Sequence, residues 1–139
     1  MTQVLVKPEF RYSELTGKII GCAMEVQKLM GNGFQEVIYQ RALKTEMANH
    51  CIAFRREFEM PVSYKNEQIG TRRVDFLVDE KISVELKAVI TLEAVHFARA
   101  INYLEAYNLE IGLLINFGNT KLAFHRFENK KYKQHHSSS

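Results

Sequence analysis

The chain has 139 residues, of which 46% are hydrophobic and 25% charged, and its formal net charge is +3. This composition is typical of one globular domain with a single core, and no apolar run approaches the ~20 residues that a membrane-spanning helix needs. Of the 19 basic residues, three lie after residue 129, so residues 1–129 carry 16 basic and 16 acidic groups. The charge balance therefore gives little support for a strongly basic nucleic-acid-binding surface.

The two ends of the chain differ from its middle. Residues 1–12 are expected to form a flexible leader without the hydrophobic segment of a secretory signal peptide, and residues 128–139 a basic, disordered tail. The domain is expected to span residues 13–127. Cys22 and Cys51 are isolated and form neither a CxxC pair nor a zinc-binding pattern. These features predict a cytoplasmic protein without a membrane segment or a structural disulfide.

The first predicted helix runs from about Ser13 to Met30. Ser13 is a suitable N-cap, and the glycine-rich residues 31–33 end the helix. Apolar residues that recur every three or four positions predict its buried face: Leu15, Ile19, Cys22, Val26 and Leu29.

A second helix is predicted over about residues 34–49. Glu36, Tyr39 and Leu43 lie along one stripe of it, so Glu36 stands beside an apolar stripe rather than on the fully solvated side. Glu36 is then either an acid favoured near the positive end of the helix dipole or a residue of a functional site.

A long alternating run over residues 52–64 predicts a strand that is apolar on one face. Arg56 interrupts this apolar face. A guanidinium at such a position is suited to pairing with a buried acid or to binding a phosphate. Residues 65–68 form a turn, and the next strand begins near Ile69.

Residues 72–87 predict two strands joined by the polar turn at residues 79–81. Apolar and polar residues alternate in both strands, so each strand has one apolar face. When both apolar faces lie on the same side, a three-residue loop pairs Val78 with Ile82.

In this register Asp75 lies directly opposite Glu85, and Lys87 follows on the same face. Two facing carboxylates repel each other unless a cation lies between them. A divalent metal bound by oxygen ligands is one candidate. The other is an ion-pair cluster with Lys87 and Arg73 as partners, and the residue pattern leaves both open.

A third helix is predicted from about Leu92 to Tyr107, with Thr91 as its N-cap. His96, Arg99 and Tyr103 share a stripe that is either a polar flank or a group facing the carboxylates. The packing face is expected to hold the apolar positions Leu92, Val95, Ala98, Ile101 and Leu104.

Two further strands complete the predicted sheet. Residues 111–117 are almost continuously apolar, which is typical of a strand covered on both faces. Residues 122–127 alternate in polarity and follow the turn at residues 118–120. The order of elements predicts an α/β (α+β) domain with a single mixed sheet flanked by helices.

Several of these segments resemble motifs of the GxxExxY protein family. Residues 33–39, Gly-Phe-Gln-Glu-Val-Ile-Tyr, are similar to the motif that names the family. Other similarities follow in order along the chain: Gly17–Gly21, Arg73–Val78, Val84–Ala88, Asn102–Leu104 and Gly112–Phe117. This family is placed in the PD-(D/E)XK nuclease superfamily. The resemblance, which spans about residues 16–127, implies a restriction-endonuclease-like α-β-β-β-α-β core with an extra N-terminal helix and a final strand.

The resemblance also implies a metal-dependent nuclease, with DNA preferred to RNA as its partner and substrate. Asp75 and Glu85 match the residues that hold Mg²⁺, for which Mn²⁺ can substitute, together with the backbone carbonyl of Leu86. Glu36 matches a carboxylate that supports the metal, directly or through water. Lys87 matches the residue that orients or activates the attacking water.

Nucleic-acid contacts are expected from Arg56, Arg73, Arg99, Tyr103 and Tyr39. Two positions differ from the family pattern, because relatives usually have histidine at the position of Gln27 and tend to have glutamine at that of Arg99. The alternative function is a non-catalytic nucleic-acid-binding or protein-interaction module on the same fold. The chain is expected to be a monomer or a homodimer.

Overall fold

The computed structural model describes residue 6 and residues 10–134. Most of the predicted leader and the end of the predicted tail lie outside these residues. The helices and strands follow the predicted order: α1 (Ser13–Met30), α2 (Glu36–Asn49), β1 (Phe54–Tyr64), β2 (Glu67–Val78), β3 (Ile82–Lys87), α3 (Ala94–Ala106), β4 (Ile111–Asn116) and β5 (Ala123–Glu128). No helix within the described part of the chain is long and apolar enough to cross a membrane.

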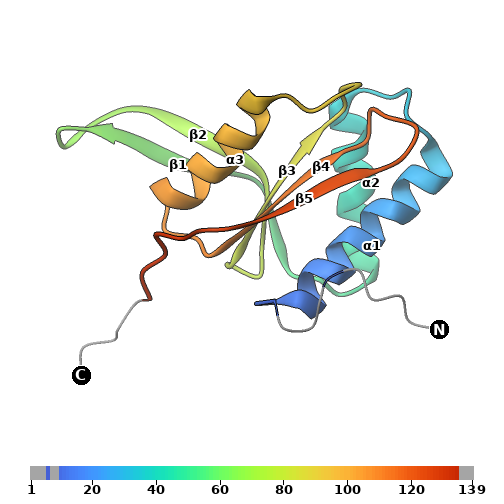
Figure 1. Cartoon of the computed structure of the whole chain (residues 1–139), viewed down its shortest axis with the longest axis horizontal. Helices are drawn as coiled ribbons and strands as arrows, with labels where there is room; N and C mark the ends of the chain where they lie inside the picture. Colours follow the sequence, from blue (N-terminus) through green and yellow to red (C-terminus); the bar gives the residue numbers. More distant parts are fainter. Residues whose placement is uncertain (1–5, 7–9, 135–139) are drawn as a thin grey trace.

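The five strands form one mixed sheet in the order β1-β2-β3-β4-β5, in which β3 and β4 are parallel and the other neighbours are antiparallel. The predicted α+β fold with a single mixed sheet is confirmed. Figure 1 shows α1 and α2 together at one end of the molecule and α3 beside the β1–β2 hairpin. The main core lies between the α1–α2 pair and the apolar residues of β2, β3 and β4.

The β2–β3 hairpin has the predicted register, with Val78 paired to Ile82. The turn between them contains Asp79 and Glu80 in left-handed backbone conformations, with φ of 51° and 58°. Aspartate tolerates this region better than β-branched residues do, which is consistent with Asp79 at the start of the turn.

The pairing of β2 with β3 ends at Phe76 and Val84, one position before Asp75 and Glu85. On the other side of β2 the ladder is also interrupted, because Glu57 has a φ of 53° and is skipped in the pairing of β1 with β2. Beyond this point the hairpin continues as a two-stranded arm over residues 58–74. α3 accompanies this arm, and the Tyr107 hydroxyl donates a 3.1 Å hydrogen bond to the Pro61 carbonyl.

Both predicted helix caps were wrong. The N-cap of α1 is Tyr12, and Ser13 is already the first helical residue. The N-cap of α3 is Glu93, whose side chain accepts from the His96 backbone while the His96 ring accepts from the Glu93 backbone. This reciprocal capping box places the start of α3 after Thr91 and Leu92, because it satisfies two backbone donors at once.

The predicted packing faces were only partly right. Leu29 at the end of α1 is 71% exposed, whereas Ile20 and Ala23 are fully buried. On α3, Val95 and Ile101 are exposed, and the buried residues are Ala100, Tyr103 and Leu104. The helix turns its aromatic side chain toward the sheet because Tyr103 can bury more apolar area than Val95 or Ile101.

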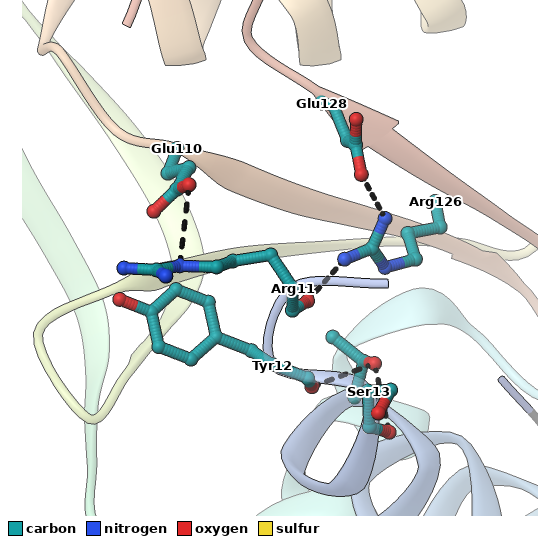
Figure 2. Close-up of polar contacts among 7 residues, drawn as sticks. Arg11, Tyr12, Ser13, Glu110, Arg126 and Glu128 are labelled. Carbon is teal, nitrogen blue, oxygen red and sulfur yellow. Dashed lines mark hydrogen bonds and ion pairs between the residues drawn. The ribbon is translucent and has the colours of Figure 1, made fainter. Parts of the chain in front are cut away.

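The residues at the start of α1 bind to β5, an edge strand of the sheet (Figure 2). Arg11 pairs with Glu110 at 3.4 Å, and Arg126 on β5 pairs with Glu128 at 2.9 Å while donating to the Arg11 carbonyl. Next to Glu110, Asn129 is buried and its side chain donates to the carbonyls of Leu104 in α3 and Leu109 in the α3–β4 connection. The chain therefore stays attached to the domain beyond the predicted boundary at residue 127.

The connection after β3 is held against the β4–β5 turn. The Asn116 side chain donates to the Val89 carbonyl at 2.8 Å and accepts from the Val89 amide at 3.0 Å. The backbone of Gly118 passes so close to this connection that an added Cβ would lie 2.3 Å from both the nitrogen and the oxygen of Val89. Gln27 on α1 fixes the same turn by donating to the Phe117 carbonyl at 3.1 Å and the Asn119 carbonyl at 2.7 Å.

Gly118→Ala is expected to lower the free energy of unfolding by about 2–3 kcal/mol, because the new methyl group would meet backbone atoms that cannot rotate away. Gly17→Ala is the matched control. It lies in α1 with no atom within 4 Å of its added Cβ, so it should be neutral or stabilising by up to ~1 kcal/mol. Urea unfolding measures both, and equal stabilities would show that the approach at Gly118 is not a rigid constraint.

Candidate active site

One polar pocket of about 330 Å³ brings together residues from α2, β2, β3 and α3. It is lined by Glu36, Arg72, Arg73, Asp75, Glu85, Leu86, Lys87 and Arg99. The four predicted catalytic side chains, Glu36, Asp75, Glu85 and Lys87, are all in this set, although they lie on three elements. The hairpin and the first turn of α2 therefore meet at one place.

Asp75 is held from two sides. Its Oδ1 accepts a 2.7 Å hydrogen bond from Gln40 Nε2 on α2, and its Oδ2 accepts a 2.7 Å hydrogen bond from the backbone N–H of Leu86 on β3. The carboxylate thus provides an acceptor for Leu86 where the strand ladder has ended. Burial raises the pKa of Asp75, while the Leu86 and Gln40 hydrogen bonds act in the opposite direction.

Glu85 faces an arginine. Its Oε1 lies 3.8 Å from Arg72 Nη2, and both side chains are mostly covered. Burial raises the pKa of Glu85, the Arg72 charge opposes this shift, and the Asp75 charge adds to it.

Glu36 lies in the first turn of α2 and is half-buried. Burial raises the pKa of Glu36, the Lys87 charge lowers it and the Asp75 charge raises it further. Asp75 is therefore close enough to both glutamates for its charge to act on them, and Lys87 lies close enough to all three carboxylates to offset part of their repulsion.

Two residues of this region were missed in the sequence. Arg72, rather than Arg73, is the ion partner of Glu85, and Arg73 instead lies 3.8 Å from Glu57 on β1. Strict alternation puts Arg72 and Asp75 on opposite faces of β2, so the residue pattern did not indicate that both line the pocket. Gln40 follows Glu36 by one helical turn, and this i, i+4 spacing was a signal that it shares the face of Glu36.

Three of the residues expected at the site lie elsewhere or have other partners. Tyr39 has no exposed surface, stacks on Phe117 with a centroid distance of 4.6 Å, and donates its hydroxyl to the Gly31 carbonyl at 2.6 Å. Tyr103 is also buried and does not line the pocket. Arg56 is exposed on β1, outside the pocket lining. A buried tyrosine has no direct access to nucleic acid, so Tyr39 and Tyr103 are unsuited to the contacts predicted for them.

The donor set of the pocket fits a hard divalent cation. Within the part of the chain that the structure describes, no three side chains of His, Cys, Asp or Glu are drawn together as a ready-made metal cluster. However, three carboxylates and Leu86 line one small pocket, and the negative charge of Asp75 raises the pKa of both Glu36 and Glu85. Mg²⁺ prefers oxygen ligands, keeps several waters and needs few protein ligands, so the residues present are compatible with it.

Comparison with known proteins identifies the scaffold. A family model described as "PD-(D/E)XK nuclease superfamily" matches residues 13–127. The fold is similar to a solved structure described as "Crystal structure of SSO0001", with a TM-score of 0.56 and 16% sequence identity over 86% of this chain and 60% of that chain. The chain thus spans less than two thirds of that structure, and the likeness concerns the fold alone. A search of curated proteins found no match.

Asp75→Asn is expected to stabilise the metal-free domain at pH 7 by about 1 kcal/mol, because it removes a buried charge beside two other carboxylates. The asparagine oxygen can still accept from Leu86. Its amide can donate to Gln40 Oε1 once the Gln40 amide turns over, because this buried atom has no hydrogen-bond partner among the described residues.

The gain should depend on pH. Burial raises the pKa of Asp75 in the folded state, so the folded wild type is most stable at low pH, where this carboxyl is protonated. The wild type loses that stability as the pH rises through the folded pKa of Asp75. The difference between Asp75→Asn and wild type should therefore grow from about pH 4 to pH 7 in urea unfolding. Asp79→Asn, an acid of the exposed β2–β3 turn, is the matched control and should show almost no difference. A larger gain at pH 4 than at pH 7 would contradict this expectation.

Proposed function

The chain belongs to the PD-(D/E)XK nuclease superfamily, and on this premise we propose that it is a metal-dependent nuclease that hydrolyses phosphodiester bonds, with DNA preferred to RNA. The observation that carries the proposal is the convergence of Glu36, Asp75, Glu85 and Lys87 on one pocket. Within the superfamily, residues 33–39 support a place in the GxxExxY family. A cytoplasmic location and a monomeric or homodimeric state remain expectations from the sequence.

We propose that Asp75, Glu85 and the backbone carbonyl of Leu86 hold Mg²⁺, with Mn²⁺ as a substitute, and that Glu36 supports the ion directly or through water. When bound, such an ion would supply Lewis-acid activation of the phosphate and would lower the pKa of a water that it holds. The hydrogen bonds from Gln40 and from the Leu86 amide keep the Asp75 carboxylate in place before any ion arrives.

Lys87 is the residue suited to the attacking water. It lines the pocket together with Glu36, Asp75 and Glu85, and its charge favours the ionised form of all three carboxylates. From that position it can donate a hydrogen bond to a water or to a phosphate oxygen and oppose the negative charge that grows in the transition state.

The charge balance of the pocket supports a polyanionic substrate. Its lining contains four cations, Arg72, Arg73, Lys87 and Arg99, and three carboxylates. With a divalent ion added, the local charge becomes clearly positive although residues 1–129 are neutral as a whole. A small concave site of this sign concentrates phosphate groups more effectively than the net charge of the chain suggests.

A second candidate function is a non-catalytic nucleic-acid-binding or protein-interaction module on the nuclease fold. The ion pair between Arg72 and Glu85 is the observation that favours it, because an arginine beside a proposed ligand competes with a metal for the same carboxylate. The two functions differ in whether the pocket binds a divalent ion.

Calorimetric titration with Mn²⁺ should show binding to the wild type and none to Asp75→Asn. Cleavage of DNA in Mg²⁺ should fall more than about 100-fold in the same variant, because both the ion and its orientation are lost. Asp79→Asn should match the wild type in both measurements, since its carboxylate lies in the exposed turn.

Wild-type protein that binds no Mn²⁺ and cleaves neither DNA nor RNA would favour the non-catalytic module. Cleavage that survives in Asp75→Asn would show that the assigned residue is not part of the reaction.

Gln40→Met tests the support of Asp75 separately. Methionine keeps the volume of the buried side chain but cannot donate to Asp75 Oδ1. We expect the affinity for Mn²⁺ to fall about 10- to 100-fold while the fold is retained. An unchanged affinity in the calorimeter would mean that Leu86 alone is sufficient to position the carboxylate.

A further inference from the structure

We propose that Arg72 binds a substrate phosphate next to the one that is cleaved, on the side of the pocket formed by α3. This inference rests on the proposed nuclease function and adds a substrate-binding residue to it. It concerns a side chain that strict alternation along β2 did not place in the pocket.

The Arg72 guanidinium is fixed by neutral groups of α3. Its Nη1 donates to Asn102 Oδ1, its Nη2 donates to the Arg99 carbonyl, and its central carbon lies 5.3 Å from the centroid of the Tyr103 ring. An amide oxygen, a backbone carbonyl and an aromatic face orient the group without cancelling its charge. Tyr103 is itself fully covered, so the platform under the guanidinium is rigid.

The fixed guanidinium still has donors to offer. An arginine has five N–H groups in a planar fork, and the contacts with Asn102 and Arg99 use one on each terminal nitrogen. The Arg72–Glu85 separation of 3.8 Å exceeds a hydrogen-bond length, so the carboxylate balances the charge without occupying a donor. The remaining N–H groups match the geometry of phosphate oxygens, and little entropy is lost because the side chain is already held.

The other cations of the pocket have different surroundings. Lys87 lies among the three carboxylates, and Arg73 has Glu57 as its ion partner. Arg99 lines the pocket together with Arg72 and lies on the same helix that anchors it. A phosphate bound at Arg72 would therefore have Arg99 as a second cation, while Lys87 remains available for the reacting phosphate.

The test measures binding without cleavage. Fluorescence anisotropy of a 5′-fluorescein-labelled single-stranded or duplex DNA of 20 nucleotides is recorded in EDTA, in an Asp75→Asn background. Arg72→Gln in this background is expected to weaken binding about 10-fold and to reduce the slope of log K against log salt by about 1, as loss of one phosphate contact does. Arg55→Gln, an exposed arginine paired with Glu80 near the opposite end of β2, should change the affinity less than 2-fold.

A second variant avoids any loss of folding. Asn102 is exposed, so Asn102→Ala should leave the domain intact while removing one anchor of Arg72. We expect an intermediate loss of DNA affinity, about 3-fold, with an unchanged salt slope because the charge is retained.

Two results would overturn the inference, and they are distinguishable. If Arg72→Gln leaves DNA binding unchanged but alters Mn²⁺ affinity in the otherwise wild-type chain, Arg72 is only a counter-ion of Glu85, and the nuclease assignment stands. If the Asp75→Asn protein does not bind DNA and the wild type cleaves none, the proposed function fails together with this inference.

Discussion

The two hydrogen bonds accepted by the Asp75 carboxylate fix the geometry on which the rest of the site depends. They join α2, β2 and β3 through Gln40 and the Leu86 amide, each at 2.7 Å. Because the carboxylate replaces a backbone acceptor for Leu86, β2 can separate from β3 after three residue pairs without leaving that amide unsatisfied. The separated β2 continues in the arm beside α3, and the pocket lies where the two strands diverge. The Asp75 side chain thus allows β2 to separate from β3 and also places a carboxylate in the pocket.

The sequence predicted those features that follow from local periodicity. The alternation of Val74 to Val78 and of Ile82 to Leu86, with a turn of three residues, was sufficient to obtain the pairing of Val78 with Ile82. The buried face of α3 and the position of Arg72 could not be obtained in this way. Arg72 lies on the α3 side because its guanidinium is bound by groups of α3, and the buried face of α3 is set by the burial of Tyr103 in place of smaller apolar residues. The position of Gln40 on the same helix face as Glu36 could have been predicted from helical spacing alone.

The pocket is a source of instability that the surrounding scaffold offsets. Burial raises the pKa values of Glu36, Asp75 and Glu85, which means that their charged forms are disfavoured in the folded protein. The connection that follows Lys87 is held by Asn116 and by the close approach of Gly118, and Gln27 ties α1 to the same turn. Gln27 therefore has a structural role in this chain. Rigid packing after Lys87 therefore offsets the unfavourable burial of the three carboxylates before it.

The sheet order also has a consequence for folding kinetics. β1, β2 and β3 pair with their neighbours in sequence, whereas the parallel pairing of β3 with β4 must wait for the crossover through α3. We therefore expect Asp75 and Glu85 to approach each other early, while water still solvates both, and the cost of removing that water to arise later, when the helices dock. A cost that appears after the transition state accelerates unfolding more than it slows folding. We expect the metal-free domain to fold at an ordinary rate but to open readily where α2 covers the carboxylates, so that an ion in the pocket would act chiefly by lengthening the lifetime of the closed form.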